Sequence, residues 1–288
     1  MNIHIKDKNT FASLVDSSII KFPIGSKLYN LDVGSSDKDY LYIYAETEFD
    51  SKSINYEHHQ LQFKEDNVDH NFTTPRNFIR NLITGDSTIN FECLFSTQMR
   101  DDVYSLSYLY NLRYEFCTFN LLNSYLGLVR RDLKIAGKYV QSMHLSKNFS
   151  IREDKPNKVL IKKIYHIVRG LASFVSILDK NFSIYYETSD CHFTGNKEFE
   201  TTRDFLINLR NNNFTSEEII SIFENCLDYQ AELKLKLQKM LLGNEIAHYP
   251  TKKILLEVDY IIRRIPYYKG SYSIISDEYL DGINGINY

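Results

Sequence analysis

Apolar and polar residues alternate through much of the first third of the chain, the pattern expected of half-buried strands. Clusters of Gly, Ser, Asn and Asp separate these runs and predict turns between them. The predicted elements are a short helix over 9–17, a strand over 18–24, a helical turn over 27–31, a strand over 38–46, and the strands QLQFK and VDHNF around a polar turn at 65–67. Next, Pro75 is expected to open a helix that stops near Gly85.

From about residue 101 the spacing of apolar residues becomes helical and stays so. The clearest case predicts an amphipathic helix over 157–179. Its apolar stripe consists of Leu160, Ile164, Ile167, Leu171, Phe174 and Leu178. Pro250 and Pro266 bracket a last predicted helix.

Another long helix has a clear start signal. Thr215 and Glu218 have the spacing of a capping box, and Phe214 with Ile219 fits the hydrophobic staple. The helix is therefore expected to begin at Thr215 and to run to about residue 242.

The change of period near residue 100 predicts an α+β chain of two domains. Residues 1–100 are expected to form a mixed β-sheet with flanking helices, and residues 101–265 an all-helical domain. Residues 266–288, which end in DGINGINY, are expected to form a C-terminal tail.

Composition narrows the class of protein. A chain of 288 residues with 43% hydrophobic residues can bury a sizeable core. The sequence has neither the roughly 20-residue apolar stretch of a membrane helix nor the pattern of a signal peptide, so we expect a cytoplasmic protein without a membrane partner. The net charge of −3 gives no overall attraction for nucleic acid, although a local basic face remains open. The bias toward Asn, Ile, Lys and Tyr is typical of an AT-rich bacterial or phage genome.

The four cysteines are far apart in the sequence and include no C-x-x-C pair. Their spacing favours isolated buried thiols over a zinc site or a disulfide framework. They are Cys93, Cys117, Cys191 and Cys226.

Two acids precede the aromatic run of the strand over 38–46. Side chains two residues apart in a strand point the same way, so Asp37 and Asp39 are expected to project together. Neighbouring carboxylates resist joint ionisation unless they share a cation, and two or three carboxylates suffice for Mg²⁺ when phosphate oxygens complete its shell. An ordinary solvated turn before a strand is the structural alternative.

A third acid and a phosphate site complete this hypothesis. Asp69 on the VDHNF strand is the preferred third ligand, with Glu65 and Asp66 in the preceding turn as alternatives. Gly25 allows the backbone to approach a phosphate closely, and the hydroxyl of Ser26 can bind its oxygens or simply cap the turn.

These residues together resemble a known family. Their order resembles the signature of the DNA polymerase beta superfamily of nucleotidyltransferases. In this signature Gly25-Ser26 is followed after ten residues by the Asp37-x-Asp39 pair and later by Asp69. More narrowly, GSKLYNLDVGSSDKDYLYIY resembles a bacterial and phage family with a G-S-[RK]-x-Y-G block before S-D-x-D-Y. Further blocks are similar in family order: DHNFTTPRNFIRNLITGDSTINFECLFS, KKIYHIVRGLASF and LINLRNNNFTSEEI. The sequence departs from the family where Asn30 replaces a glycine and Asp86-Ser87 replaces Asn-Pro.

The resemblance implies an enzyme, a nucleotidyltransferase that moves a nucleoside monophosphate from an NTP, expected to be ATP, to an acceptor hydroxyl. It implies a catalytic domain over 1–100 and a substrate-binding or acceptor-binding helical domain over 101–265. Asp37, Asp39 and Asp69 would be the catalytic residues and would hold Mg²⁺ or Mn²⁺. The implied nucleotide-binding residues are Gly25, Ser26, Lys27, Lys162, His166 and Arg169.

Several alternatives stay open. The acceptor is an RNA end, a protein or a small molecule. Lys162, His166 and Arg169 line one side of a helix and equally fit a solvated basic face. The competing functions are a catalytically silent nucleotide-binding sensor, an antitoxin-like interaction protein, and a structural protein without a nucleotide site.

Overall fold

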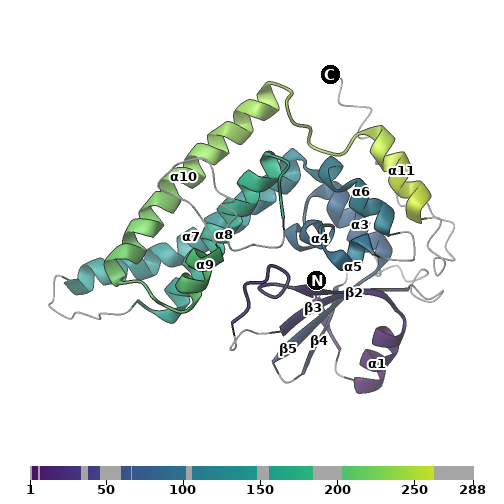
Figure 1. Cartoon of the computed structure of the whole chain (residues 1–288), viewed down its shortest axis with the longest axis horizontal. Coiled ribbons are helices and arrows are strands. Elements are labelled where there is room, and N and C mark those ends of the chain that lie inside the picture. The colour runs from purple at the N-terminus through teal and green to yellow at the C-terminus, as the bar shows by residue number, and fades with distance from the viewer. Residues whose placement is uncertain are drawn as a thin grey trace. The chain divides into compact units, whose positions relative to one another are not determined.

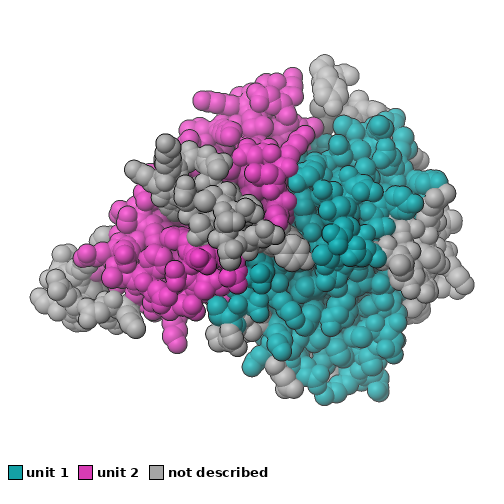
Figure 2. Space-filling model, in the orientation of Figure 1, with its two compact units in different colours: residues 1–118, 249–288 teal, residues 119–248 magenta. Residues whose placement is uncertain are grey.

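The computed structural model describes residues 2–5, 7–33, 38–45, 60–65, 67–101, 106–147, 156–183 and 203–262. The chain forms two compact units (Figure 2). Unit 1 consists of residues 1–118 and 249–288, and unit 2 consists of residues 119–248. Unit 2 is thus inserted between two segments of unit 1.

Within the described residues, unit 1 contains a five-stranded mixed sheet in the order β1-β4-β5-β3-β2. The strands are β1 (Asn2–His4), β2 (Ser18–Ile24), β3 (Lys38–Tyr44), β4 (Gln60–Glu65) and β5 (Val68–Thr73). Strand β3 is parallel to β5 and antiparallel to β2, while β4 is antiparallel to β5 and parallel to β1. The alternating segments of the sequence therefore pair side by side.

Different helices pack on the two faces of the sheet (Figure 1). On one face, Tyr42, Phe63 and Phe72 form an apolar cluster, against which helix α1 (Lys8–Asp16) packs with Phe11. On the other face, Phe22 stacks on Phe78 of helix α3 with ring centroids 6.2 Å apart. Because side chains alternate along a strand, odd and even positions of β3 belong to different environments.

Helix α3 (Pro75–Thr84) has the boundaries that its sequence signals predict. The Thr74 side chain accepts a hydrogen bond from the Asn77 amide, Pro75 occupies the first turn, and Gly85 ends the helix at φ 70°. The other helices described in unit 1 are α4 (Thr88–Cys93), α5 (Thr97–Arg100), α6 (Ser107–Asn111), the 3₁₀ helix η2 (Arg113–Phe116) and α11 (Lys252–Ile262).

Unit 2 is helical in its described part. Helices α7 (Phe119–Lys147) and α8 (Lys158–Leu178) pack closely at Gly170. A Cβ built on this glycine would lie only 2.8 Å from Cγ2 of Val129 on α7. The remaining helices there are α9 (Arg203–Arg210) and α10 (Ser216–Leu242). Thr215 caps α10, and both hydrogen bonds of the predicted capping box with Glu218 are present.

The α+β class, with a mixed sheet, flanking helices and a helical region after it, is confirmed. The predicted helical turn over 27–31 corresponds to hydrogen-bonded turns over residues 25–30, in which the Asn30 amide donates to the Lys27 carbonyl. The turns do not continue into a longer helix, because Asn30 has a positive φ of 54°.

The compact units divide the chain at other positions than the predicted domains. Residues 101–118 belong to unit 1, and so does α11, which the sequence analysis groups with the helical domain. Helix α11 packs against α3 and α6 within unit 1, which is the physical reason for this grouping. The functional domain boundaries stay a prediction, and the tail over 266–288 lies outside the described residues.

Candidate functional site at one end of the sheet

Asp39 and Asp69 lie opposite each other on neighbouring strands. They are register partners in the parallel pair of β3 and β5, each at the second residue of its strand. Partners in a ladder point their side chains to the same side of the sheet. Two carboxylates from segments 30 positions apart in the sequence therefore share one face and one end of the sheet.

The Gly25 turn belongs to the same end. Ile24, the last residue of β2, pairs with Asp39. Gly25 has φ 66°, and a Cβ built on it would lie 3.1 Å from Oδ2 of Asp39. The absence of a side chain at residue 25 thus leaves the backbone in close reach of the Asp39 carboxylate.

A left-handed residue also ends this turn. Asn30 has φ 54°, and the Leu31 amide donates a hydrogen bond of 2.9 Å to the Ser26 carbonyl. Asn tolerates the left-handed region better than most residues other than Gly. This conformation accounts for Asn30 at the position where the resembled family has glycine.

Ser26 and Lys27 follow Gly25 in the turn. Ser26 is half-buried, whereas Lys27 is exposed and donates a hydrogen bond of 3.2 Å from Nζ to the Tyr40 hydroxyl. Tyr40 packs on the α1 face of the sheet, opposite to its neighbour Asp39. In this conformation the Lys27 ammonium group is directed to Tyr40.

Asp69 has a cationic neighbour that the sequence analysis missed. Lys64, its register partner on β4, places Nζ 3.0 Å from Oδ1 of Asp69. The Asp69 side chain is 46% exposed, so this ion pair is a weak, solvent-screened one. A carboxylate has two oxygens with several acceptor sites, and pairing with Lys64 leaves it able to accept further contacts.

The other acids of the prediction are placed differently. Asp37 and Asp66 lie outside the described residues. Glu65 ends β4 and forms an ion pair with Lys8. In the described part of the chain no three His, Cys, Asp or Glu side chains group to hold a metal ion. The Asp39 and Asp69 carboxylates, in register beside Gly25, nevertheless offer the hard oxygen donors that Mg²⁺ prefers.

Lys162, His166 and Arg169 belong to α8 in unit 2. Asp132 on α7, which contacts His166, is buried, with a side chain 4% exposed. It accepts a hydrogen bond of 3.0 Å from Lys163 and contacts Arg131 at 3.2 Å and His166 Nδ1 at 3.4 Å. The acid that organises this helix pair is thus Asp132, and Lys163, not Lys162, binds it.

His166 is a neutral base near pH 7. Burial, with the positive charge of Arg169, lowers its pKa to about 4, although the Asp132 charge opposes this. The 3.4 Å contact with Asp132 is therefore an ion pair only in acid.

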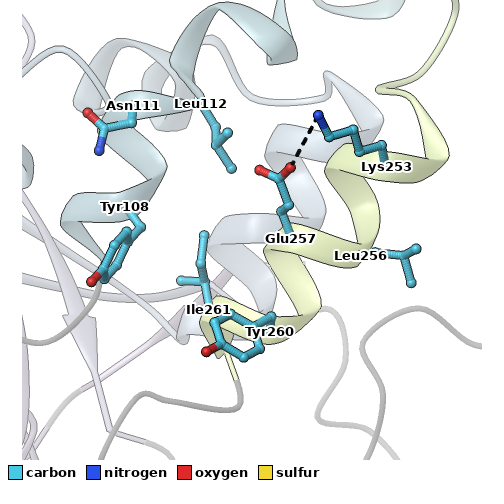
Figure 3. Close-up of a pocket in the computed structure, with 8 residues that line it drawn as sticks. All are labelled: Tyr108, Asn111, Leu112, Lys253, Leu256, Glu257, Tyr260 and Ile261. Carbon is cyan, nitrogen blue, oxygen red and sulfur yellow. Dashed lines mark ion pairs between the residues drawn. The ribbon is translucent and has the colours of Figure 1, made fainter.

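A separate pocket of about 470 Å³ lies between α6 and α11 in unit 1 (Figure 3). Leu112, Leu256 and Ile261 give it apolar walls. Lys253 and Glu257 lie 4.0 Å apart among its lining residues. None of the predicted site residues lines this pocket, so it is distinct from the end of the sheet with Asp39 and Asp69.

Two other sequence features have structural explanations. Ser87, in the segment that departs from the family, caps α4 by accepting a hydrogen bond from the Asn90 amide. Cys93 and Cys226 are buried free thiols, as expected, and burial raises the pKa of each. Cys117 is half-buried and Cys191 lies outside the described residues.

Two residues that contact the predicted site residues are not predicted from the sequence: Lys64 and Asp132. Lys64 becomes visible only through the strand register, which a sequence motif does not specify. Asp132 has a local signal, since it is the one acid in the sequence of α7.

No family model matches the chain, and no curated protein matches it. A search of solved structures found similarity to a nucleotidyltransferase-like protein from Exiguobacterium sibiricum 255-15. The two are 11% identical, with a TM-score of 0.32, over 96% of this chain and 87% of that chain. Similarity this weak carries no argument about function. Of the helices in the described residues, none has the length and apolar character to cross a membrane.

Proposed function

We propose that the chain is a metal-dependent nucleotidyltransferase that moves a nucleoside monophosphate from an NTP to an acceptor hydroxyl. One observation supports this most: Asp39 and Asp69 are register partners on one face of the sheet, with the Gly25 backbone against Asp39. The motif resemblance joins these same residues to phosphoryl transfer.

Asp39 and Asp69, with Asp37, would hold Mg²⁺ or Mn²⁺. When bound, such ions neutralise the charge that develops on the transferring phosphate and the leaving oxygen. The turn at Gly25 and Ser26 would place backbone amides and a hydroxyl against the triphosphate. Lys27, Lys162, His166 and Arg169 stay proposed nucleotide contacts, and ATP is the expected NTP.

The bond changes are those of in-line displacement. The acceptor oxygen forms a bond to the α-phosphorus as the bond from that phosphorus to the bridging oxygen breaks, and pyrophosphate leaves with that electron pair. Asp69 accepts the acceptor hydroxyl proton. The reaction needs no oxidant or reductant.

The test uses α-labelled NTPs with Mg²⁺ or Mn²⁺ and acceptor fractions of RNA, protein and small molecules. Asp39→Asn and Asp69→Asn should each lower transfer by about 100-fold or more, because each removes a charge used in the transition state. Asp16→Asn, an exposed acid at the end of α1, is the matched control and should transfer normally. Undiminished transfer by both site variants would refute this site.

One observation favours a catalytically silent nucleotide-binding protein, sensor or antitoxin-like partner. Lys64 lies 3.0 Å from Asp69 and partly offsets the charge of one of the acids that transfer needs. This second function predicts NTP binding by calorimetry without release of pyrophosphate under any acceptor condition. Wild type distinguishes the two functions, because only a transferase releases pyrophosphate. A gain of pyrophosphate release in Lys64→Gln would show that the pair with Asp69 is what silences the protein.

A further inference from the structure

Positive charge is concentrated in one pair of helices. The sequences of α7 and α8 contain nine lysines and arginines and one acid, Asp132, although the whole chain has a net charge of −3. Helix α10 of the same unit has five acids and three lysines. The net charge of the α7 and α8 pair is therefore positive, whereas that of the rest of the chain is negative.

Much of this charge is at the surface. Among the cationic side chains whose exposure the structure describes on the two helices, six are exposed, and we term these six the basic surface. Its members are Arg130, Arg131, Lys134 and Lys138 on α7, and Lys158 and Lys162 on α8.

The single acid of these helices pairs with one member of the basic surface, since Asp132 lies 3.2 Å from Arg131. Asp132 is buried and already binds Lys163 at 3.0 Å, a side chain that is only 21% exposed. Burial alone would raise the pKa of Asp132, but Lys163 and Arg131 lower it below its ordinary value. Asp132 is therefore ionised and paired with Lys163 and Arg131. The sequences of α7 and α8 contain no second acid to offset the other five exposed cations.

The spacing of the cations suits a ligand with repeated charge. Arg130, Lys134 and Lys138 recur every four residues, as do Lys158 and Lys162. A four-residue step advances about 6 Å along a helix and keeps side chains on one face. A row of lysines and arginines along a helix is the electrostatic footprint of a nucleic-acid binder.

We propose that the basic surface of α7 and α8 binds the phosphate backbone of a nucleic acid. This binding does not require catalysis. Naming nucleic acid as the acceptor class, over a protein or a small molecule, rests on the proposed function.

The test is fluorescence anisotropy of the full chain with a labelled 20-nucleotide single-stranded RNA, in EDTA and without NTP, over a series of NaCl concentrations. Wild type should bind with an affinity that falls steeply with salt. Lys134→Gln with Lys158→Gln and Lys162→Gln should weaken binding by about 10-fold or more and reduce the salt slope by about 2, because each phosphate contact on a single strand contributes about 0.7.

The matched control removes three exposed lysines of α10 in the same unit, by Lys234→Gln, Lys236→Gln and Lys239→Gln. It has the same net charge and should bind within about 2-fold of wild type, since it leaves the basic surface intact. Equal weakening by both triple variants would overturn the assignment of the surface. A labelled single-stranded DNA arm tells the two nucleic acids apart.

Four further outcomes decide the ligand and separate this inference from the proposed function. No binding of RNA or DNA, or equally tight binding of polyglutamate, overturns a nucleic-acid ligand. RNA binding without transfer of label to any acceptor supports the inference and contradicts the proposed function. Transfer to a protein or small molecule without nucleic-acid binding supports the proposed function and contradicts this inference.

Discussion

Two left-handed residues shape the turn beside Asp39. We predict that Gly25→Ala destabilises the protein by about 1–2 kcal/mol, because a Cβ is disfavoured at positive φ. That Cβ would also lie 3.1 Å from Oδ2 of Asp39, so the variant should shift this carboxylate and lower transfer. Urea unfolding and the labelled-NTP assay measure the two effects.

Asn30→Gly is the matched change at the other end of the turn. Gly adopts the Asn30 φ of 54° without strain, so the free energy of unfolding should change by less than about 0.5 kcal/mol. Equal stability of Gly25→Ala and wild type would show that the turn does not require a left-handed residue there.

His166 gives the protein a pH dependence in mild acid. Its pKa is about 4 in the folded chain and about 6.5 in an unfolded one, so the unfolded state binds the proton first. The stabilising contribution is complete above pH 6.5 and is lost as the pH falls toward 4. His166→Gln should therefore show a smaller fall in Tm between pH 7 and pH 5 than wild type. An unchanged fall would place the titrating group elsewhere.

At the scale of single residues, the sequence was a partial guide. Asp39, Asp69 and Gly25 were predicted, and the structure groups them because motif residues at strand ends come together through pairing. Lys64 and Asp132 were missed, since their partners lie on other strands or helices and the contact depends on register or packing. Local patterns contain no information about such pairs.

At the scale of elements, the periodic segments were predicted well. The apolar stripe of α8 and the capping box of α10 are local signals, and both helices match them. Strands β2 to β5 also match alternating runs, whereas β1, with three residues, is too short to have a period. Short helices such as α5 have the same limitation.

Helix packing provides a test in which two local effects oppose each other. Ala is a better helix former than Gly by about 1 kcal/mol, so propensity alone predicts that Gly170→Ala stabilises α8. We predict the opposite sign, a loss of about 1–2 kcal/mol, because the new Cβ would lie 2.8 Å from Cγ2 of Val129. Thermal unfolding measures the change.

The matched rescue is Gly170→Ala with Val129→Ala, which removes the clashing methyl group. The double variant should lose less free energy of unfolding than the two single variants lose together, by at least about 0.5 kcal/mol. Simple additivity would show that α7 and α8 move apart without cost.

At the scale of the whole molecule, the two compact units predict separate responses to core damage. Leu171→Ala removes a fully buried side chain from α8, and Leu82→Ala removes one that is 1% exposed from α3. Each should destabilise its own unit by about 2–5 kcal/mol. Hydrogen exchange should therefore rise mainly in unit 2 for the first variant and mainly in unit 1 for the second. A uniform rise throughout the chain in both variants would mean that the units unfold together.

The insertion of unit 2 between two segments of unit 1 has a consequence for how such a chain can change in evolution. The ends of unit 2 meet, since the Phe119 amide donates a hydrogen bond of 2.8 Å to the Ala247 carbonyl and the Phe119 and His248 rings lie 4.9 Å apart. A domain whose two ends are adjacent can be replaced by another inserted domain, because the connections on both sides keep their positions. A gene could thus acquire an inserted domain of different charge in place of unit 2, while the strands with Asp39 and Asp69 keep their connections.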